Sequence, residues 1–298
     1  MPNATIIDIQ KQDIVVIPTQ CQLGEGIQWN IQDQKLYWTD ILGHKMYRCR
    51  IDGSELEEMS FAKRLCSFAF IKQSEAIFCA FESHCAEIYF GTEIQDNMIH
   101  IEMPAGVRLN DGRCDRQGRF WVGSMGEGSL TKDRVGELYL INKGSYQAML
   151  GKIGISNGLS WSIDGKTMYF ADSLLGEIYT YAFDTTTGQI SDKNLFARVP
   201  DGGSPDGSVV DHQNYIWNAQ WGISRIARYS PDGKEDCVIA LPVSQPSCLC
   251  FCGPDLQHVA VTSAWDGLHP DRVTSYDGSV LIFKTDFMGL PEELYCLR

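Results

Sequence analysis

The chain has 298 residues, of which 44% are hydrophobic, so it is long enough to bury a large core. Its formal net charge is −13, which argues against nucleic-acid or anionic-membrane partners, because both require a basic face. No apolar run approaches the roughly 20 residues of a membrane span, and the first residues show no signal peptide. The 11 cysteines, an odd number, fit free thiols in a reducing, cytoplasmic compartment.

Two short β-prone runs, residues 5–9 and 14–17, open the chain, and Pro18 ends the second. They precede a series of repeats, and an open ring of repeats would leave unpaired strand edges. We therefore expect both runs to close a ring by pairing with the last repeat.

One pattern then recurs six times. A polar residue, usually followed by glycine, heads an alternating apolar strand; a turn, an aromatic-rich strand, a second turn and a third strand follow. The clearest copy is ISNGLSWSIDGKTMYFADSLLGEIYTYAFD, residues 155–184. Period-2 alternation broken by Asp-Gly and Gly turns predicts antiparallel hairpins. The other copies begin near residues 23, 64, 110, 205 and 247.

The spacing of the copies indicates the fold. The second strands align at one residue each, in steps of 40 to 49 residues, which is about the length of a four-stranded propeller blade. These residues are Trp38, Phe78, Trp121, Phe170, Trp217 and Ala260. We place the fourth strands in the linking stretches, such as 55–60, 100–102, 194–199 and 237–241. No helix-period segment or linker interrupts the series. The sequence therefore predicts an all-β fold, a single six-bladed β-propeller domain of residues 1–298 with four-stranded antiparallel blades.

The residues that head the repeats are the candidates for chemistry. The first strand of each blade lines the central channel, so its head residue points toward the axis. The heads are Glu25, Cys66, Asp111, Asn157, Asp206 and Ser247. Carboxylates crowded around one axis repel each other unless a cation lies among them. Oxygen ligands without His or Cys pairs suit Ca²⁺, Mg²⁺ or Mn²⁺, with Zn²⁺ or Fe²⁺ also open. The alternative is that the Asp-Gly and Asn-Gly pairs are only turns.

Four motifs resemble the SMP-30/gluconolactonase family: LGEG at 23–26, RLNDG at 108–112, ISNGLSWSIDG at 155–165 and PDG at 205–207. The resemblance covers nearly the whole chain and implies a six-bladed propeller with metal-dependent sugar lactonase activity. It implies that Glu25, Asn157 and Asp206 bind one divalent metal ion. It also implies that Arg108 and Asn110 hold the substrate, with Glu127 the nearest match to a further acidic substrate contact.

These assignments predict hydrolysis of a sugar-acid lactone to the open aldonic acid. A metal-activated water would attack the lactone carbonyl, and Asp206 would accept its proton, while Asp111 braces its loop. The expected partner is a small sugar lactone, and the expected state is a monomer or weak homo-oligomer.

Other functions stay open. One is a non-catalytic calcium-binding or protein-binding propeller, since LYWTD at 36–40 is typical of YWTD propellers. Another is a luciferin-regenerating-type enzyme of the same family, and a third is a paraoxonase-like activity. Cys248, Cys250 and Cys252 share one strand face and are more typical of a buried strand than of a site. Trp221 and Trp265 are more typical of packing than of a pocket rim, and 267–277 is expected to be a substrate-selecting loop.

Overall fold

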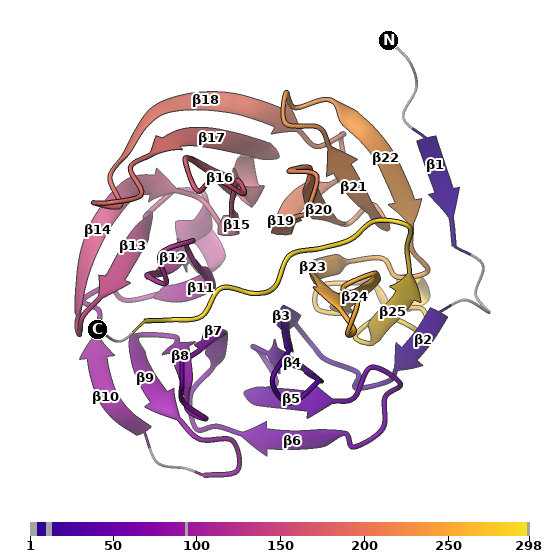
Figure 1. Ribbon diagram of the computed structural model, residues 1–298, viewed down its shortest axis with the longest axis horizontal. Coiled ribbons are helices and arrows are strands. Elements are labelled where there is room, and N and C mark those ends of the chain that lie inside the picture. The colour runs from indigo at the N-terminus through magenta and orange to yellow at the C-terminus, as the bar shows by residue number, and fades with distance from the viewer. Residues whose placement is uncertain (1–4, 10–13, 93–94, 297–298) are drawn as a thin grey trace.

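The computed structural model describes residues 5–9, 14–92 and 95–296. Its strands form six sheets arranged as a ring around a central axis, and the sheets follow one another around the ring in chain order (Figure 1). The architecture is a six-bladed β-propeller, as the repeat spacing predicted. Within the described ranges, no helix has the length and apolar character that a membrane span requires.

Each blade runs from an innermost strand at the axis to an outermost strand at the rim. Blade 1 consists of β3 (Gly24–Asn30), β4 (Lys35–Asp40), β5 (Lys45–Cys49) and β6 (Glu57–Ser60). Blade 2 consists of β7 (Leu65–Phe70), β8 (Ile77–Phe81), β9 (His84–Ile88) and β10 (Gln95–His100). Blade 3 consists of β11 (Val107–Cys114), β12 (Phe120–Gly126), β13 (Gly136–Asn142) and β14 (Ser145–Ile153).

The second half of the ring repeats this order. Blade 4 consists of β15 (Ser156–Trp161), β16 (Thr167–Asp172), β17 (Glu177–Phe183) and β18 (Ile190–Arg198). Blade 5 consists of β19 (Ser204–Val210), β20 (Ile216–Trp221), β21 (Arg225–Tyr229) and β22 (Glu235–Ala240). Blade 6 consists of β23 (Pro246–Cys252), β24 (His258–Ser263) and β25 (Val280–Lys284), with an outer strand from the start of the chain. The helical turns are η2 (Gly128–Thr131), η3 (Ser173–Leu175) and η4 (Pro270–Arg272).

The two N-terminal runs take different places. β2 (Ile14–Ile17) pairs antiparallel with β25 and completes blade 6, as expected for a ring closure. β1 (Thr5–Asp8) instead pairs parallel with β22 and extends blade 5 to five strands, so the expectation that both runs close the last blade was wrong. Blade 6 lacks only one strand, and the free edge of β22 offers the first run its unpaired backbone groups.

One predicted outer strand was misplaced. Blade 2 ends with β10, residues 95–100, which pairs with β9, and not with 100–102. The sequence of β10, QDNMIH, is mostly polar and exposed, and its pairing shifts between Asp96 and Ile99. The hydrophobic alternation that marks the inner strands is therefore missing there. The second strands lie where the spacing placed them, and their indole rings at Trp38, Trp121 and Trp217 are fully buried.

The C-terminal strap, residues 285–296, crosses the middle of the ring after β25 (Figure 1). It bonds to turns that connect first and second strands: the amide of His212 donates to the carbonyl of Met288 at 3.0 Å, and the amide of Cys296 donates to the carbonyl of Gly118 at 2.8 Å. These turns lie at the end of the first strands that is opposite to the head residues. The strap therefore crosses the far end of the channel from the candidate site.

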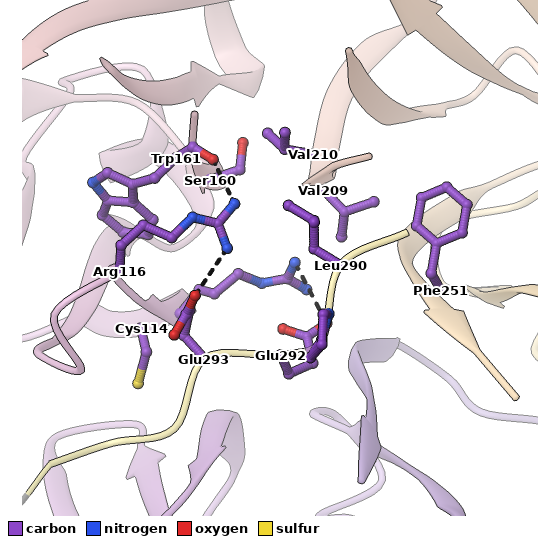
Figure 2. A pocket seen from close by; sticks show the side chains of 12 residues that line it. Cys114, Arg116, Ser160, Trp161, Val209, Val210, Phe251, Leu290, Glu292 and Glu293 are labelled. Atoms are coloured by element: carbon purple, nitrogen blue, oxygen red, sulfur yellow. Dashed lines mark hydrogen bonds and ion pairs between the residues drawn. The ribbon is translucent and has the colours of Figure 1, made fainter. Parts of the chain in front are cut away.

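Charged side chains connect the strap to the channel (Figure 2). Arg116 Nη1 pairs with Glu293 Oε1 at 3.1 Å, and Arg113 Nη1 lies 3.8 Å from Glu292 Oε1. The space left between them is about 30 Å³, which is on the scale of a single water molecule. Between these side chains the strap therefore leaves room for little more than one water molecule.

Candidate functional site

The first strands share a local irregularity near their head residues. In each of them the antiparallel register with the second strand breaks once, which is the signature of a β-bulge. In β3 the break follows Glu25, and in β15 it follows Asn157. The next residues, Gly26 and Gly158, have φ values of +60° and +65°, a region that glycine adopts without strain. The repeated polar-Gly pair therefore marks a bulge that turns the head side chain toward the axis.

Five of the six predicted site residues meet in one cavity of about 330 Å³, at the end of the ring opposite to the strap. Each exposes at most 8% of its surface. They come from blades 1, 3, 4 and 5, and they are Glu25, Arg108, Asn110, Asn157 and Asp206. Residues separated by up to 181 positions in the chain thus face one space.

The sixth predicted residue, Glu127, does not line the cavity. Its carboxylate binds Arg64, with oxygens 2.6 and 3.0 Å from the two terminal guanidinium nitrogens, and lies 3.4 Å from Arg108 Nε. This arrangement holds the pKa of Glu127 below its ordinary value, chiefly through the hydrogen bonds from Arg64. Glu127 therefore contacts the cavity through Arg108, and its direct contact with a substrate stays a prediction.

The third head residue was assigned one position too late. Asn110 lines the cavity, whereas Asp111 does not. Leu109 pairs with Ser124 and Gly112 pairs with Val122, so both Asn110 and Asp111 lie in the bulge. Because the motif has two polar residues before its glycine, the sequence alone does not show which of them faces the axis at the height of the cavity. Asp111 lies deeper in the channel, where its Oδ2 accepts a hydrogen bond from the amide of Leu159 at 3.3 Å.

The heads of blades 2 and 6 do not line the cavity either. Cys66 is a buried thiol, 1% exposed. The Ser247 hydroxyl donates to the carbonyl of Gly24 and so connects blades 6 and 1. These two positions serve the packing of the ring.

A chain of hydrogen bonds orients the amide of Asn157. Asn110 Nδ2 donates to Asn157 Oδ1 at 2.9 Å, and Asn157 Nδ2 donates to Ser173 Oγ at 2.8 Å. Ser173 Oγ in turn donates to the carbonyl of Pro205 at 2.6 Å. The network spans blades 3, 4 and 5 and fixes the amide oxygen of Asn157 toward Asn110, where its second lone pair is available to a ligand. Ser173 was missed because nothing in the repeat marks it except its place just after the second strand.

The electrostatics of the cluster favour a bound cation. Burial, and next the carboxylate of Asp111, raise the pKa of Glu25 to about 8. Burial, and next the carboxylates of Glu25 and Asp111, raise the pKa of Asp206 well above its ordinary value. Carboxylates in this environment ionise readily only when a positive charge is close.

The donor set fits an oxygen-coordinated divalent ion. Asp206 Oδ1 is buried and has no hydrogen-bond partner among the described residues, and such an orphaned acceptor is the kind of group that a metal ion satisfies. Two carboxylates and one amide oxygen are ligands typical of hard cations. In the described part of the chain, no three His, Cys, Asp or Glu side chains converge as a metal cluster, so the candidate depends on the amide of Asn157 as its third donor.

The remaining cavity wall includes residues that the sequence did not single out. Met125, Ile155 and Leu23 supply apolar surface, and Asp266 supplies a further carboxylate. Trp221 also lines the cavity, although packing was the favoured interpretation for it. Trp265 does not line it; its indole nitrogen donates to the carbonyl of Gln20 at 3.1 Å.

The cysteines are structural. All 11 are free thiols, and Cys248, Cys250 and Cys252 are buried in β23. The prediction of a buried strand is confirmed for these three. Burial raises the pKa values of their thiols, which lowers their reactivity.

Comparison with known proteins places this geometry in context. The chain is 36% identical over 284 residues to L-arabinolactonase of Azospirillum brasilense, with 94% of each chain covered. It is 30% identical over 283 residues to 6-deoxy-6-sulfogluconolactonase of Pseudomonas putida, covering 92% of this chain and 94% of the relative. The crystal structure of a calcium-binding protein, regucalcin, from Agrobacterium tumefaciens superposes with a TM-score of 0.91 at 27% identity, covering 98% of this chain and 99% of that one. The sequence model of the SMP-30/gluconolactonase/LRE-like region matches residues 23–265, and the chain belongs to this family.

Proposed function

We propose that this protein hydrolyses a sugar-acid lactone with the help of one divalent metal ion held by Glu25, Asn157 and Asp206. The lactonase activity is supported by the relatives of this chain. Proteins that align over more than nine-tenths of the chain are named as lactonases, and this chain is a lactonase of the same family. The observation that carries the proposal is the convergence of Glu25, Asn157 and Asp206 with Arg108 and Asn110 on one cavity, with all five side chains buried.

The three ligand residues supply only part of a coordination shell, so positions remain for water and substrate. When bound there, a divalent cation supplies Lewis-acid polarisation of the lactone carbonyl and acidifies a water molecule. The oxygen donors suit Ca²⁺, Mg²⁺ or Mn²⁺, and Zn²⁺ and Fe²⁺ belong in the same test.

Two side chains orient the lactone in this proposal. Arg108 is 5% exposed, and its Nη1 donates to the carbonyl of Leu109 at 2.9 Å and to Asn110 Oδ1 at 2.6 Å. These contacts fix the guanidinium plane at the cavity wall, where its remaining donors face ring and exocyclic oxygens. Asn110 is fixed between Arg108 and Asn157, so a lactone bound against this pair has its carbonyl directed toward the ligand residues.

Asp206 is the proposed base. As the water oxygen attacks the carbonyl carbon, the carboxylate oxygen of Asp206 that does not bind the metal accepts the proton that the water loses. The bond between the carbonyl carbon and the ring oxygen then breaks, and the proton passes to that ring oxygen, which becomes the hydroxyl of the open aldonic acid. One water is consumed, and Asp206 ends in its starting state.

A second candidate is a propeller that binds calcium without catalysis. It is supported by the structurally similar regucalcin from Agrobacterium tumefaciens, which is described as a calcium-binding protein. A luciferin-regenerating enzyme shares the fold with a TM-score of 0.86 at 24% identity, a likeness that supports the fold alone. The two candidates differ in one respect: a lactonase uses the buried Arg108 beside the ligand residues to bind its substrate, whereas a calcium-binding propeller has no use for a cationic side chain there.

The test is a pH-indicator assay of a panel of aldonolactones with Ca²⁺, Mg²⁺, Mn²⁺, Zn²⁺ or Fe²⁺. The wild type should hydrolyse at least one lactone in a cation-dependent way. Asp206→Asn should lose about a thousandfold in kcat, whereas Asp201→Asn, at an exposed aspartate in the turn before β19, should match the wild type. Cation binding without hydrolysis of any lactone would favour the calcium-binding candidate.

A further inference from the structure

The cavity has a second polar end that the family motifs do not describe. Arg108 and Asn110 belong to blade 3, and Asp266 follows β24 of blade 6, which lies on the opposite side of the ring (Figure 1). The ligand residues Glu25, Asn157 and Asp206 come from the blades between them. A molecule whose reacting carbonyl lies at the ligand residues and whose one end lies on Arg108 therefore extends toward Asp266.

Asp266 is held in place by three hydrogen bonds. Its backbone amide donates to the carbonyl of Gln22 at 3.1 Å, and its Oδ1 accepts from Gln22 Nε2 at 2.9 Å. Its own carbonyl accepts from Gln245 Nε2 at 3.0 Å. These bonds engage one carboxylate oxygen and leave the other for the cavity. A carboxylate is an acceptor only, so the group that it recognises is a donor such as a hydroxyl.

The charges along the cavity wall also favour a neutral group at the Asp266 end. Its lining residues include the carboxylates of Glu25, Asp206 and Asp266 and a single cationic side chain, Arg108. The guanidinium of Arg108 already binds the carbonyl of Leu109 and Asn110, and it lies 3.4 Å from Glu127. An anionic group placed at the Asp266 end would meet a like charge, and the one cationic side chain of the lining, Arg108, lies at the other end of the cavity.

We infer that Asp266 determines the substrate specificity of the lactonase: it accepts hydrogen bonds from hydroxyl groups remote from the lactone carbonyl, and it excludes lactones that carry an anionic group there. The preferred substrates are then neutral polyhydroxylated lactones. Trp221, in the same wall, gives an apolar surface for the C–H face of the sugar. This inference rests on the proposed lactonase function and adds to it the chemical class of the substrate.

The test compares three lactones with the wild type and with Asp266→Asn. Glucono-1,5-lactone carries the remote hydroxyls, δ-valerolactone has the same ring without them, and glucarolactone carries an added carboxylate. For Asp266→Asn, kcat/KM should fall about 10- to 100-fold on gluconolactone, mainly through KM. It should stay within about twofold on δ-valerolactone and rise about tenfold or more on glucarolactone, because the charge repulsion is gone.

The matched control is Asp271→Asn, which removes an aspartate whose side chain is 89% exposed, five residues further along the same loop. It should leave all three rates unchanged. An equal loss on all three lactones with Asp266→Asn would show a merely structural role, and unchanged rates on all three would show no role; either result overturns the inference. A wild type that hydrolyses none of the lactones would instead overturn the proposed function itself.

Discussion

Asn110 Nδ2 donates a hydrogen bond to Asn157 Oδ1 over 2.9 Å, and this bond joins the proposed substrate-binding motif to the proposed metal-binding motif. Asn110 also accepts from Arg108 Nη1 at 2.6 Å, so one side chain fixes two partners with different roles. The two motifs lie 47 positions apart in the chain and meet only because blades 3 and 4 are neighbours. The proposed substrate orientation and the proposed metal coordination are therefore coupled through Asn110.

This coupling predicts a double effect of Asn110→Ala. Loss of the donor to Asn157 should lower metal affinity about tenfold, because partners that orient a ligand residue typically contribute 10- to 100-fold. The loss of orientation at Arg108 should lower kcat/KM for a lactone even at saturating metal. Metal titration and steady-state kinetics measure the two effects separately, and Asn194→Ala on the exposed strand β18 is the control. An effect on kinetics with unchanged metal affinity would show that the two motifs are independent.

A buried ion pair in blade 5 predicts a large loss of stability. Asp211 is fully buried; its Oδ2 accepts from Trp217 Nε1 at 2.9 Å and from Arg228 Nε at 2.8 Å. Asp211→Ala would leave the buried guanidinium and indole without this partner, and the free energy of unfolding should fall by about 3 kcal/mol. Urea unfolding checks the value. Asp232→Ala, which removes an exposed ion pair with Lys234, should change it by less than about 0.5 kcal/mol; equal effects of both variants would contradict the account.

The strap predicts a specific pH dependence of stability. Burial raises the pKa of Glu292 above its ordinary value of 4.5, although the guanidinium of Arg113 opposes the shift. The folded state then holds this proton more tightly than the unfolded state, so the contribution of Glu292 to stability is fully present below the unfolded pKa and is lost as the pH rises through the folded pKa. Glu292→Gln removes this titration. Compared with the wild type, the variant should gain relative stability as the pH rises from about 4 to about 7.

Urea unfolding of both proteins across this pH range gives the difference directly. Glu293→Gln, at the neighbouring and more exposed carboxylate that pairs with Arg116, serves as the control for loss of a strap charge. If the difference in the free energy of unfolding between wild type and Glu292→Gln stays constant with pH, then Glu292 does not titrate in this window. Its burial beside Arg113 would then not make stability depend on pH.

The sequence predicts the ring because its signal is repeated. In each repeat, a first strand of alternating apolar and polar residues is followed by a second strand that carries a buried aromatic or aliphatic residue. One copy of this pattern would be ambiguous, but six copies at regular spacing indicate a propeller. The polar-Gly pairs at Glu25, Asn157 and Asp206 could be predicted as site residues for the same reason, because they recur at the start of the repeats. Their convergence follows from the architecture, because residues at equal height in a ring face one axis.

The features that the sequence did not predict depend on residues that do not recur from blade to blade. The bulge in β11 places Asn110 at the cavity and moves Asp111 deeper, a one-residue difference that the RLNDG motif does not specify. Asp266 and Ser173 lie just beyond second strands, where sequence varies with each blade. The exposed strand β10 lacks a buried face, so it has no apolar alternation to detect.

The central claim is that Glu25, Asn157 and Asp206 jointly hold one divalent cation, and equilibrium dialysis against a divalent cation measures this most directly. The wild type should bind about one cation per chain, and Glu25→Gln, Asn157→Ala and Asp206→Asn should each bind far less at the same free concentration. Asp201→Asn should bind as the wild type does. One cation per chain in all three site variants, with the fold intact, would contradict the claim.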